Sequence, residues 1–110
     1  MRNKIKKALS TTNVPVFLGA WHGEGEAPPQ YIVFTTRMRA ILAGGDTIVD
    51  RVYTAQVDIW SIKDFTELEM DVTKAMEEQG FLLTDSYDTY EYGGYHLSMT
   101  WECGANHGEI

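Results

Sequence analysis

The chain has 110 residues, 44% of them hydrophobic and 12% aromatic, so it can form one domain with a modest core and is too rich in core-forming residues to be a disordered tail. No apolar run reaches the roughly 18–20 residues of a membrane-spanning helix, and no apolar stretch typical of a secretory signal follows the charged N-terminus. The single cysteine, Cys103, excludes an internal disulfide and favours a reducing compartment.

Charge is distributed unevenly along the chain. The net charge is −7, yet four of the nine basic residues lie within the first seven positions. The other 103 residues carry five basic against 16 acidic groups. An acidic body of this kind repels phosphates, so only the basic N-terminal segment is a candidate for contacting nucleic acid or an acidic partner. A solvated helix end is the more ordinary interpretation of that segment.

The N-terminal third predicts a helix, an extended segment and a loop. Residues 1–10 have apolar positions at helical spacing, and "STTN" then interrupts the helix because its side chains compete for backbone hydrogen bonds. "VPVFLGAW" is extended, since Pro15 lacks an N–H and moves Val14 out of the helical region. Residues 20–30 contain two glycines and two prolines, which predict a flexible loop.

The middle of the chain predicts strands. "YIVFTT" and "MRAILA" are rich in strand-forming residues, and "GGD" at 44–46 indicates a turn. "VDRVYTAQVDIW" alternates, which places Tyr53, Ala55, Val57 and Ile59 on one face. This alternation is typical of a sheet that is packed on one face and partly solvated on the other.

One amphipathic helix is predicted over residues 61–80. Two start signals compete, a capping box of Ser61 with Asp64 or one of Asp64 with Glu67. Gly80 suits the C′ position of a Schellman ending. The apolar stripe of this helix consists of Phe65, Leu68, Val72, Ala75, Met76 and Gln79.

The C-terminal part predicts a hairpin. "FLLTDSYDTYEY" and "YHLSMTWEC" flank Gly93 and Gly94, which permit the positive φ angles of a tight primed turn. The second run alternates, so Cys103 falls on its apolar face and His96 on the opposite face. Residues 104–110 are expected to fray. The predicted fold is a single α+β domain over 1–110, in which a mostly antiparallel sheet of about four strands packs against one main helix, with a short N-terminal helix beside it or swinging free.

Few residues favour catalysis or cofactor binding. "GEGEAP" lacks the third glycine of a phosphate loop and carries two glutamates that would repel phosphate. A Cys103–His96 dyad is disfavoured because the two side chains point to opposite faces. Asp58 is most simply a hydrogen-bonded polar residue on the wetter sheet face. We therefore expect no catalytic residues and no cofactor; the alternative is a small acidic metal-binding or enzymatic domain whose candidate residues are His22, His96, Cys103 and His107.

Aromatic residues cluster near the predicted hairpin tip, where Tyr87, Tyr90, Tyr92 and Tyr95 alternate with acidic residues. Acidic neighbours argue against stacking on nucleobases. Amphipathic tyrosines at a hairpin end fit a protein–protein surface better.

Taken in order, the chain resembles the tail-completion (head–tail joining) proteins of long-tailed bacteriophages. The matching pieces are the short N-terminal helix, "VPVF", "PPQYIVF", "VDIWS", the acidic helix that closes in "GF", and "YHLSMTWE". They cover nearly all of residues 1–103. The order and spacing of these pieces carry the resemblance.

The resemblance implies a non-enzymatic virion subunit, present in the host cytoplasm during assembly, that forms a ring of usually six copies. One side of such a ring meets the tail tube and the other meets the head-completion (stopper) protein, while DNA passes through the lumen without specific binding and no membrane is involved. The loop before Tyr31 would project toward a partner or a neighbouring subunit. The predicted interface residues are Trp21, His22, Gly23, Glu24, Gly25, Glu26, Pro28, Pro29, Tyr90 and Tyr92.

Overall fold

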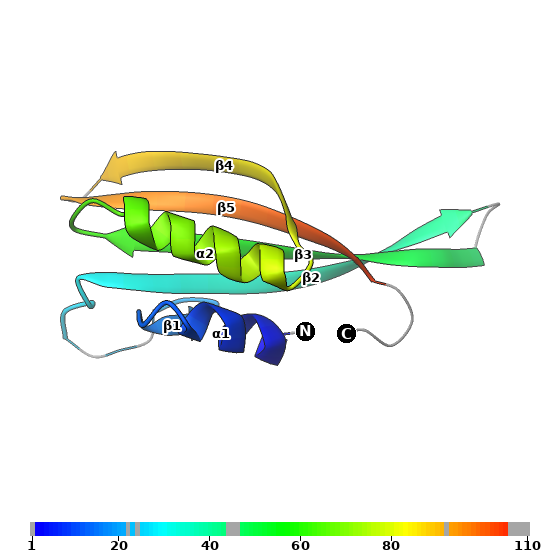
Figure 1. The fold of residues 1–110 in the computed structure, drawn as a ribbon, viewed down its shortest axis with the longest axis horizontal. Helices are drawn as coiled ribbons and strands as arrows, with labels where there is room; N and C mark the ends of the chain where they lie inside the picture. Colours follow the sequence, from blue (N-terminus) through cyan, green and yellow to red (C-terminus); the bar gives the residue numbers. More distant parts are fainter. Residues whose placement is uncertain (1, 22, 24, 44–46, 92, 106–110) are drawn as a thin grey trace.

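The computed structural model describes residues 2–21, 23, 25–43, 47–91 and 93–105. In chain order the elements are α1 (Arg2–Ser10), β1 (Val16–Leu18), β2 (Gln30–Ala43), β3 (Thr47–Ser61), α2 (Thr66–Glu78), β4 (Leu82–Glu91) and β5 (Gly94–Ala105). The molecule is elongated, 50 × 27 × 24 Å, and the β2–β3 pair extends beyond the rest of the sheet at one end (Figure 1).

The five strands form one mixed sheet in the order β1-β2-β3-β5-β4. The α+β class is confirmed, but the number of strands is five rather than about four, because Val16–Leu18 pairs in parallel with Ile32–Phe34 at one edge. All other pairs are antiparallel. Parallel neighbours need a crossover connection, and residues 19–29 supply it. The predicted loop therefore has a topological role, and its last residue, Gln30, already belongs to β2.

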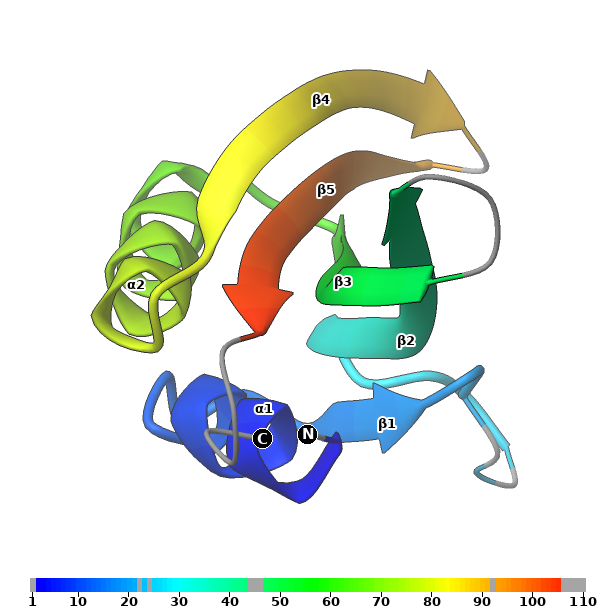
Figure 2. The same cartoon turned by 90° about the vertical axis from the view of Figure 1, so that its right-hand side faces the viewer.

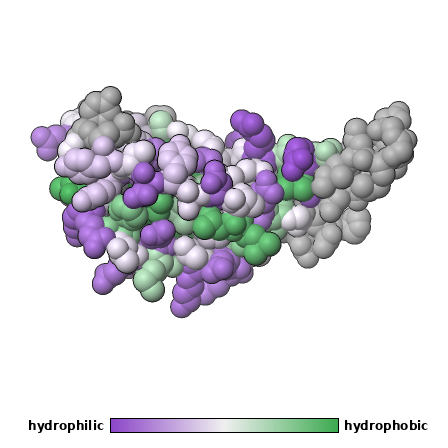
Figure 3. All heavy atoms as spheres, turned by 90° about the horizontal axis from the view of Figure 1, so that it is seen from above, coloured by the Kyte–Doolittle hydropathy of each residue, from purple (hydrophilic) through white to green (hydrophobic). Residues whose placement is uncertain are grey.

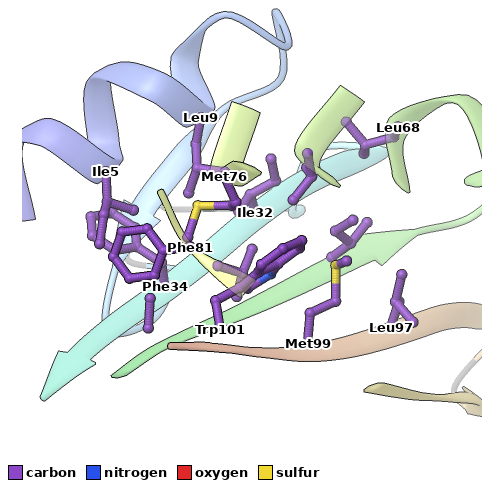
Figure 4. Close-up of a cluster of buried hydrophobic side chains, with 14 residues drawn as sticks. Ile5, Leu9, Ile32, Phe34, Leu68, Met76, Phe81, Leu97, Met99 and Trp101 are labelled. Atoms are coloured by element: carbon purple, nitrogen blue, oxygen red, sulfur yellow. The ribbon is translucent and has the colours of Figure 1, made fainter. Parts of the chain in front are cut away.

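Both helices cover the same face of the curved sheet (Figure 2). The core lies between them and three strands, and Figure 4 shows the side chains of α1, α2 and β5 converging around Trp101. The N-terminal helix is therefore packed on the sheet, because Ile5 and Leu9 are fully buried. The buried strand residues are those that the alternation predicts: Ile32, Phe34, Ala55, Val57, Ile59, Leu97, Met99 and Trp101.

The start of α2 differs from both predicted capping boxes. β3 continues through Ser61, which pairs with Gln30, so Ser61 cannot cap a helix. Asp64 Oδ1 accepts hydrogen bonds from the Thr66 hydroxyl at 2.6 Å and the Thr66 backbone N–H at 2.9 Å. These two bonds lower the pKa of the Asp64 carboxyl, the side-chain bond most. The helix begins at Thr66 after an N-cap residue, Phe65, that makes no side-chain cap bond.

The end of α2 is the predicted Schellman motif. The N–H of Gly80 donates to Glu77 O at 2.9 Å, and the N–H of Phe81 donates to Met76 O at 3.1 Å. Met76 and Phe81 are both buried in the core cluster. Gly80 has a φ of +87°, the left-handed conformation that this motif requires.

Replacing Gly80 with alanine is expected to lower the free energy of unfolding by about 1–2 kcal/mol. The nearest atom to an added Cβ is Cys103 Sγ at 3.9 Å, an ordinary contact, so the loss is conformational rather than steric. Urea unfolding should show a lower midpoint with an unchanged m-value. Gly80→Asn is the control, since asparagine tolerates this conformation better and should lose less. Equal stability of wild type and Gly80→Ala would contradict this account.

The C-terminal hairpin is confirmed, with a different turn and a later end than predicted. Glu91 pairs with Gly94, so Gly94 is a strand residue, and of the two glycines Gly93 takes the positive φ, +76°. β5 runs to Ala105, because Gly104 and Ala105 pair with Val52 and Arg51 of β3; residues 104–105 are therefore ordered into the sheet. The predicted frayed end at 106–110 and the predicted turn at 44–46 lie outside the described residues.

Candidate functional site

The face of the sheet that the helices leave uncovered carries a row of rings. Cross-strand register places Tyr31 of β2, Trp60 of β3 and His96 of β5 side by side. The Trp60 and His96 rings are stacked with centroids 3.8 Å apart, and Tyr31 and Trp60 follow at 6.3 Å. Phe17 of β1 adds an edge contact to Tyr31 at 6.1 Å. This row connects four strands through ring contacts at one end of the sheet.

A polar network lies next to this row. Asp58 Oδ1 and His96 Nε2 are 3.1 Å apart, with side chains 23% and 16% exposed. Gln56 Nε2 donates to Ser98 Oγ, and the Thr100 hydroxyl donates to Gln56 Oε1 at 3.1 Å. Asp58 is thus the hydrogen-bonded polar residue that the sequence predicts on the wetter face.

This network contains aspartate, histidine and serine, the residue types of a hydrolase's catalytic site, but a substrate cannot reach the serine. Ser98 is 2% exposed, so its hydroxyl is closed to a substrate, and it accepts its hydrogen bond from an amide rather than facing a base. Within the described residues, no three histidine, cysteine, aspartate or glutamate side chains gather in a way that could hold a metal ion. The network therefore connects β3 and β5 through side-chain hydrogen bonds.

The two described residues of the alternative metal-binding or enzymatic site, His96 and Cys103, do not lie together. His96 lies on the uncovered face with Trp60, whereas Cys103 packs against the core on the opposite face and its Sγ contacts Gly104 O at 3.4 Å. His22 and His107 lie outside the described residues.

An apolar depression of about 310 Å³ opens at the end of the sheet opposite the β2–β3 tip. It is formed where the 19–29 connection, the end of β3 and the start of β5 meet. We call this surface the loop end; its lining side chains include Pro28, Pro29, Tyr31, Trp60, Ile62 and Tyr95. Ile62 is 67% exposed and Tyr95 37% exposed. Partial burial raises the pKa of the Tyr31 hydroxyl above its ordinary value.

Hydrogen bonds fix the proline segment to the end of β3. The N–H of Ile62 donates to Pro29 O at 3.0 Å, and Gln30 Nε2 donates to Ser61 Oγ at 3.0 Å. Ser61, which is buried, also donates to Lys63 O at 2.7 Å. The rim of the depression is thus held by backbone and side-chain bonds rather than by packing alone, and Ile62 is presented outward from a fixed backbone.

The structure brings together part of the predicted interface. Pro28 and Pro29 line the depression, and exposed Tyr90 joins it through an edge contact with Tyr95 at 5.0 Å. The half-buried Trp21 side chain lies against Gly23, so close that a Cβ there would be 2.7 Å from the indole nitrogen. Gly25 and Glu26 are exposed in the 19–29 connection, away from the depression's lining. His22, Glu24 and Tyr92 lie outside the described residues.

Four of the lining residues named above are absent from the predicted interface: Tyr31, Trp60, Ile62 and Tyr95. Trp60 and Tyr95 carried a signal, because strand alternation places Trp60 on the wetter face and the tyrosine cluster includes Tyr95. No sequence pattern marked Ile62 as an interface residue, since the sequence favoured a helix there. Only the continuation of β3 through Ser61 leaves Ile62 outside both the helix and the core.

Comparison by sequence, with protein-family models and with curated proteins, gave no match. No described helix is long and apolar enough to cross a membrane. Solved structures that are similar in fold include components of two particles. One is a chain of the virion of a native gene transfer agent (GTA) particle, with a TM-score of 0.61 and 7% identity over 91% of this chain and 90% of that chain.

Another similar structure is from an extracellular contractile injection system, the PVC sheath/tube terminator in its extended state. Its TM-score is 0.50 with 6% identity, and the match covers 96% of this chain but 57% of that one. At these identities the likeness concerns the fold. The chain thus has the α+β fold of structural components of phage-like and tail-like particles.

Proposed function

We propose that this protein is a non-enzymatic virion subunit that completes the tail of a phage or phage-like particle and joins it to the head. In this role it assembles as a ring, of six copies on the resemblance to head–tail joining proteins, between the tail tube and the head-completion protein. The observation that carries the proposal is the fold match over about nine tenths of both chains with a GTA virion component. The similarity to a sheath/tube terminator supports a position at the end of a tube.

The loop end supports a docking role at that position. It combines exposed apolar and aromatic side chains with a hydrogen-bonded frame, the composition that partner surfaces favour at their centre. We propose that it contacts the end of the tail tube. An acidic body also suits a subunit whose lumen passes DNA, because phosphates gain nothing from carboxylates.

Electron microscopy of particles made without the gene tests this function. We expect DNA-filled heads and unattached tails, with joining restored by a plasmid copy of the wild-type gene. Joined, infectious particles in the absence of the gene would contradict the proposal. Heads that fail to fill with DNA would also contradict it, because they would indicate a role before the joining step.

A further inference from the structure

The two edges of the sheet carry opposite charge. α1 and β1 lie at one edge and β4 at the other, and α2 lies between them in contact with both α1 and β4 (Figure 2). Residues 1–23 contain four basic and no acidic residues, whereas residues 64–91 contain nine acidic and one basic. The described charged side chains are almost all exposed: Arg2, Lys4, Lys6 and Lys7 on α1, and Glu67, Asp71, Glu77, Glu78, Asp85 and Asp88 on α2 and β4.

The basic side chains of α1 are not neutralised within the chain. None of Arg2, Lys4, Lys6 and Lys7 forms an ion pair with a described residue; Arg2 instead donates from Nε to the Thr36 hydroxyl at 3.3 Å. α1 also adjoins acidic α2, yet no ion pair joins the two helices in the described part of the chain. The basic edge is therefore available to carboxylates outside this chain.

The opposite edge is an uncovered strand. Every residue from Leu82 to Tyr90 is exposed although β4 belongs to the sheet. Four of them are large and apolar, with Leu82 72%, Leu83 44%, Tyr87 57% and Tyr90 66% exposed. Figure 3, seen from the β4 side, shows apolar patches separated by hydrophilic side chains. A long open edge of this composition pairs readily with other chains unless a specific partner covers it.

We infer that the β4 edge of one copy docks against the α1–β1 edge of the next copy, through contact of α1 lysines with the carboxylates of α2 and β4. A contact of two β4 edges is disfavoured because like charges would meet, and so is a contact of two α1 edges. β1 has only three residues and offers few ladder hydrogen bonds, so charge supplies the selectivity.

A head-to-tail contact of this kind is heterologous, and it closes into a ring when the rotation between copies permits. This inference rests on the proposed function for the ring, and it adds which surfaces meet. Its test uses the purified full chain, so that its failure is distinguishable from a failure of the head–tail role.

Zero-length carbodiimide cross-linking tests the contact directly, because it joins only lysines and carboxylates that touch. A mixture of ¹⁴N- and ¹⁵N-labelled protein separates links between copies from links within one copy. We expect mixed-isotope links between residues 1–10 and residues 64–91, lost at high salt. Absence of such links would overturn the inference, and so would links dominated by another pair of surfaces.

Charge reversal makes the contact quantitative. Lys4→Glu, Lys6→Glu and Lys7→Glu change the net charge of residues 1–23 from +4 to −2, whereas Glu78→Lys, Asp85→Lys and Asp88→Lys change that of residues 64–91 from −8 to −2. We expect each triple variant to self-associate about tenfold or more weakly than wild type in sedimentation, and an equimolar mixture to recover association. The second triple variant is decisive, because it brings the net charge from −7 to −1, and net repulsion alone would predict stronger association.

Arg39→Glu is the control, since this side chain is exposed on β2 and does not line the pocket that Arg37 shares with Arg2 of α1. It should cross-link and associate like wild type apart from the general effect of added charge. Association of each triple variant at wild-type strength would overturn the inference. If the contact is not found but the gene-deletion particles show unattached tails, the inferred contact is wrong and the proposed head–tail role remains. If the contact is found but particles join without the gene, the contact remains and the head–tail role is wrong.

Discussion

Truncating Trp101 to alanine is expected to lower the free energy of unfolding by about 3–5 kcal/mol. Trp101 is fully buried and lies in the core cluster, paired in register with Ala55 of β3 and Leu83 of β4 (Figure 4). Truncating this side chain leaves a cavity between the helices and the sheet, and movement of these elements cannot close it fully. Against a typical total stability of about 5–15 kcal/mol, this loss should unfold much of the protein on mild heating. Urea and thermal unfolding followed by circular dichroism measure it.

Trp101→Phe separates packing from polarity. The indole Nε1 is buried and has no hydrogen-bond acceptor among the described residues, so the native tryptophan already bears an unpaired donor. Phenylalanine removes that donor while keeping an aromatic ring in the core. We expect it to lose well under half of what alanine loses. Equal destabilisation by the two substitutions would contradict this account.

Replacing Ile62 with glutamate is expected to disable docking at the loop end while leaving the fold intact. The side chain is 67% exposed, so stability should change by no more than about 0.5 kcal/mol. A carboxylate in the centre of an apolar docking surface is desolvated without a partner. We expect capture of tail tubes to weaken by roughly 30-fold, the ratio for about 2 kcal/mol at a central interface residue. Pull-down of isolated tails and counts of joined particles measure it.

Met70→Glu is the matched control for this prediction. Met70 is also 67% exposed but lies on α2, outside the lining of the depression. It should keep wild-type capture and joining. If Ile62→Glu joins heads to tails normally, or if both variants fail alike, the loop end is not the docking surface.

Local patterns in the sequence were sufficient where short-range physics dominates. The 3.6-residue period of α2, the glycine that ends it, and the alternation of β3 and β5 each depend on residues within a few positions of one another. The interpretation of Asp58 as a hydrogen-bonded polar residue follows from the same alternation. These features identify the core face correctly before any tertiary contact is known.

The same reasoning identified only some of the residues around the loop end. Pro28, Pro29 and Tyr90 were found as a turn signal and a tyrosine cluster, and the structure places them around one surface. Ile62 was missed because the Ser61 and Asp64 capping signals pointed to a helix start there. Register with Gln30 overrode that signal, since a paired strand end satisfies the backbone of Ser61.

The sequence by itself determined the α+β class, the main helix and its ending, the core-facing residues of the central strands and the uneven charge along the chain. Only the tertiary structure decided that Val16–Leu18 pairs in parallel as a fifth strand, that both helices share one face, and that basic α1 and acidic β4 lie at opposite edges. The physical reason is how far apart in the chain the interacting residues lie. Helix period, strand alternation and glycine conformation are local, whereas strand order and edge position depend on pairings between residues far apart in the chain.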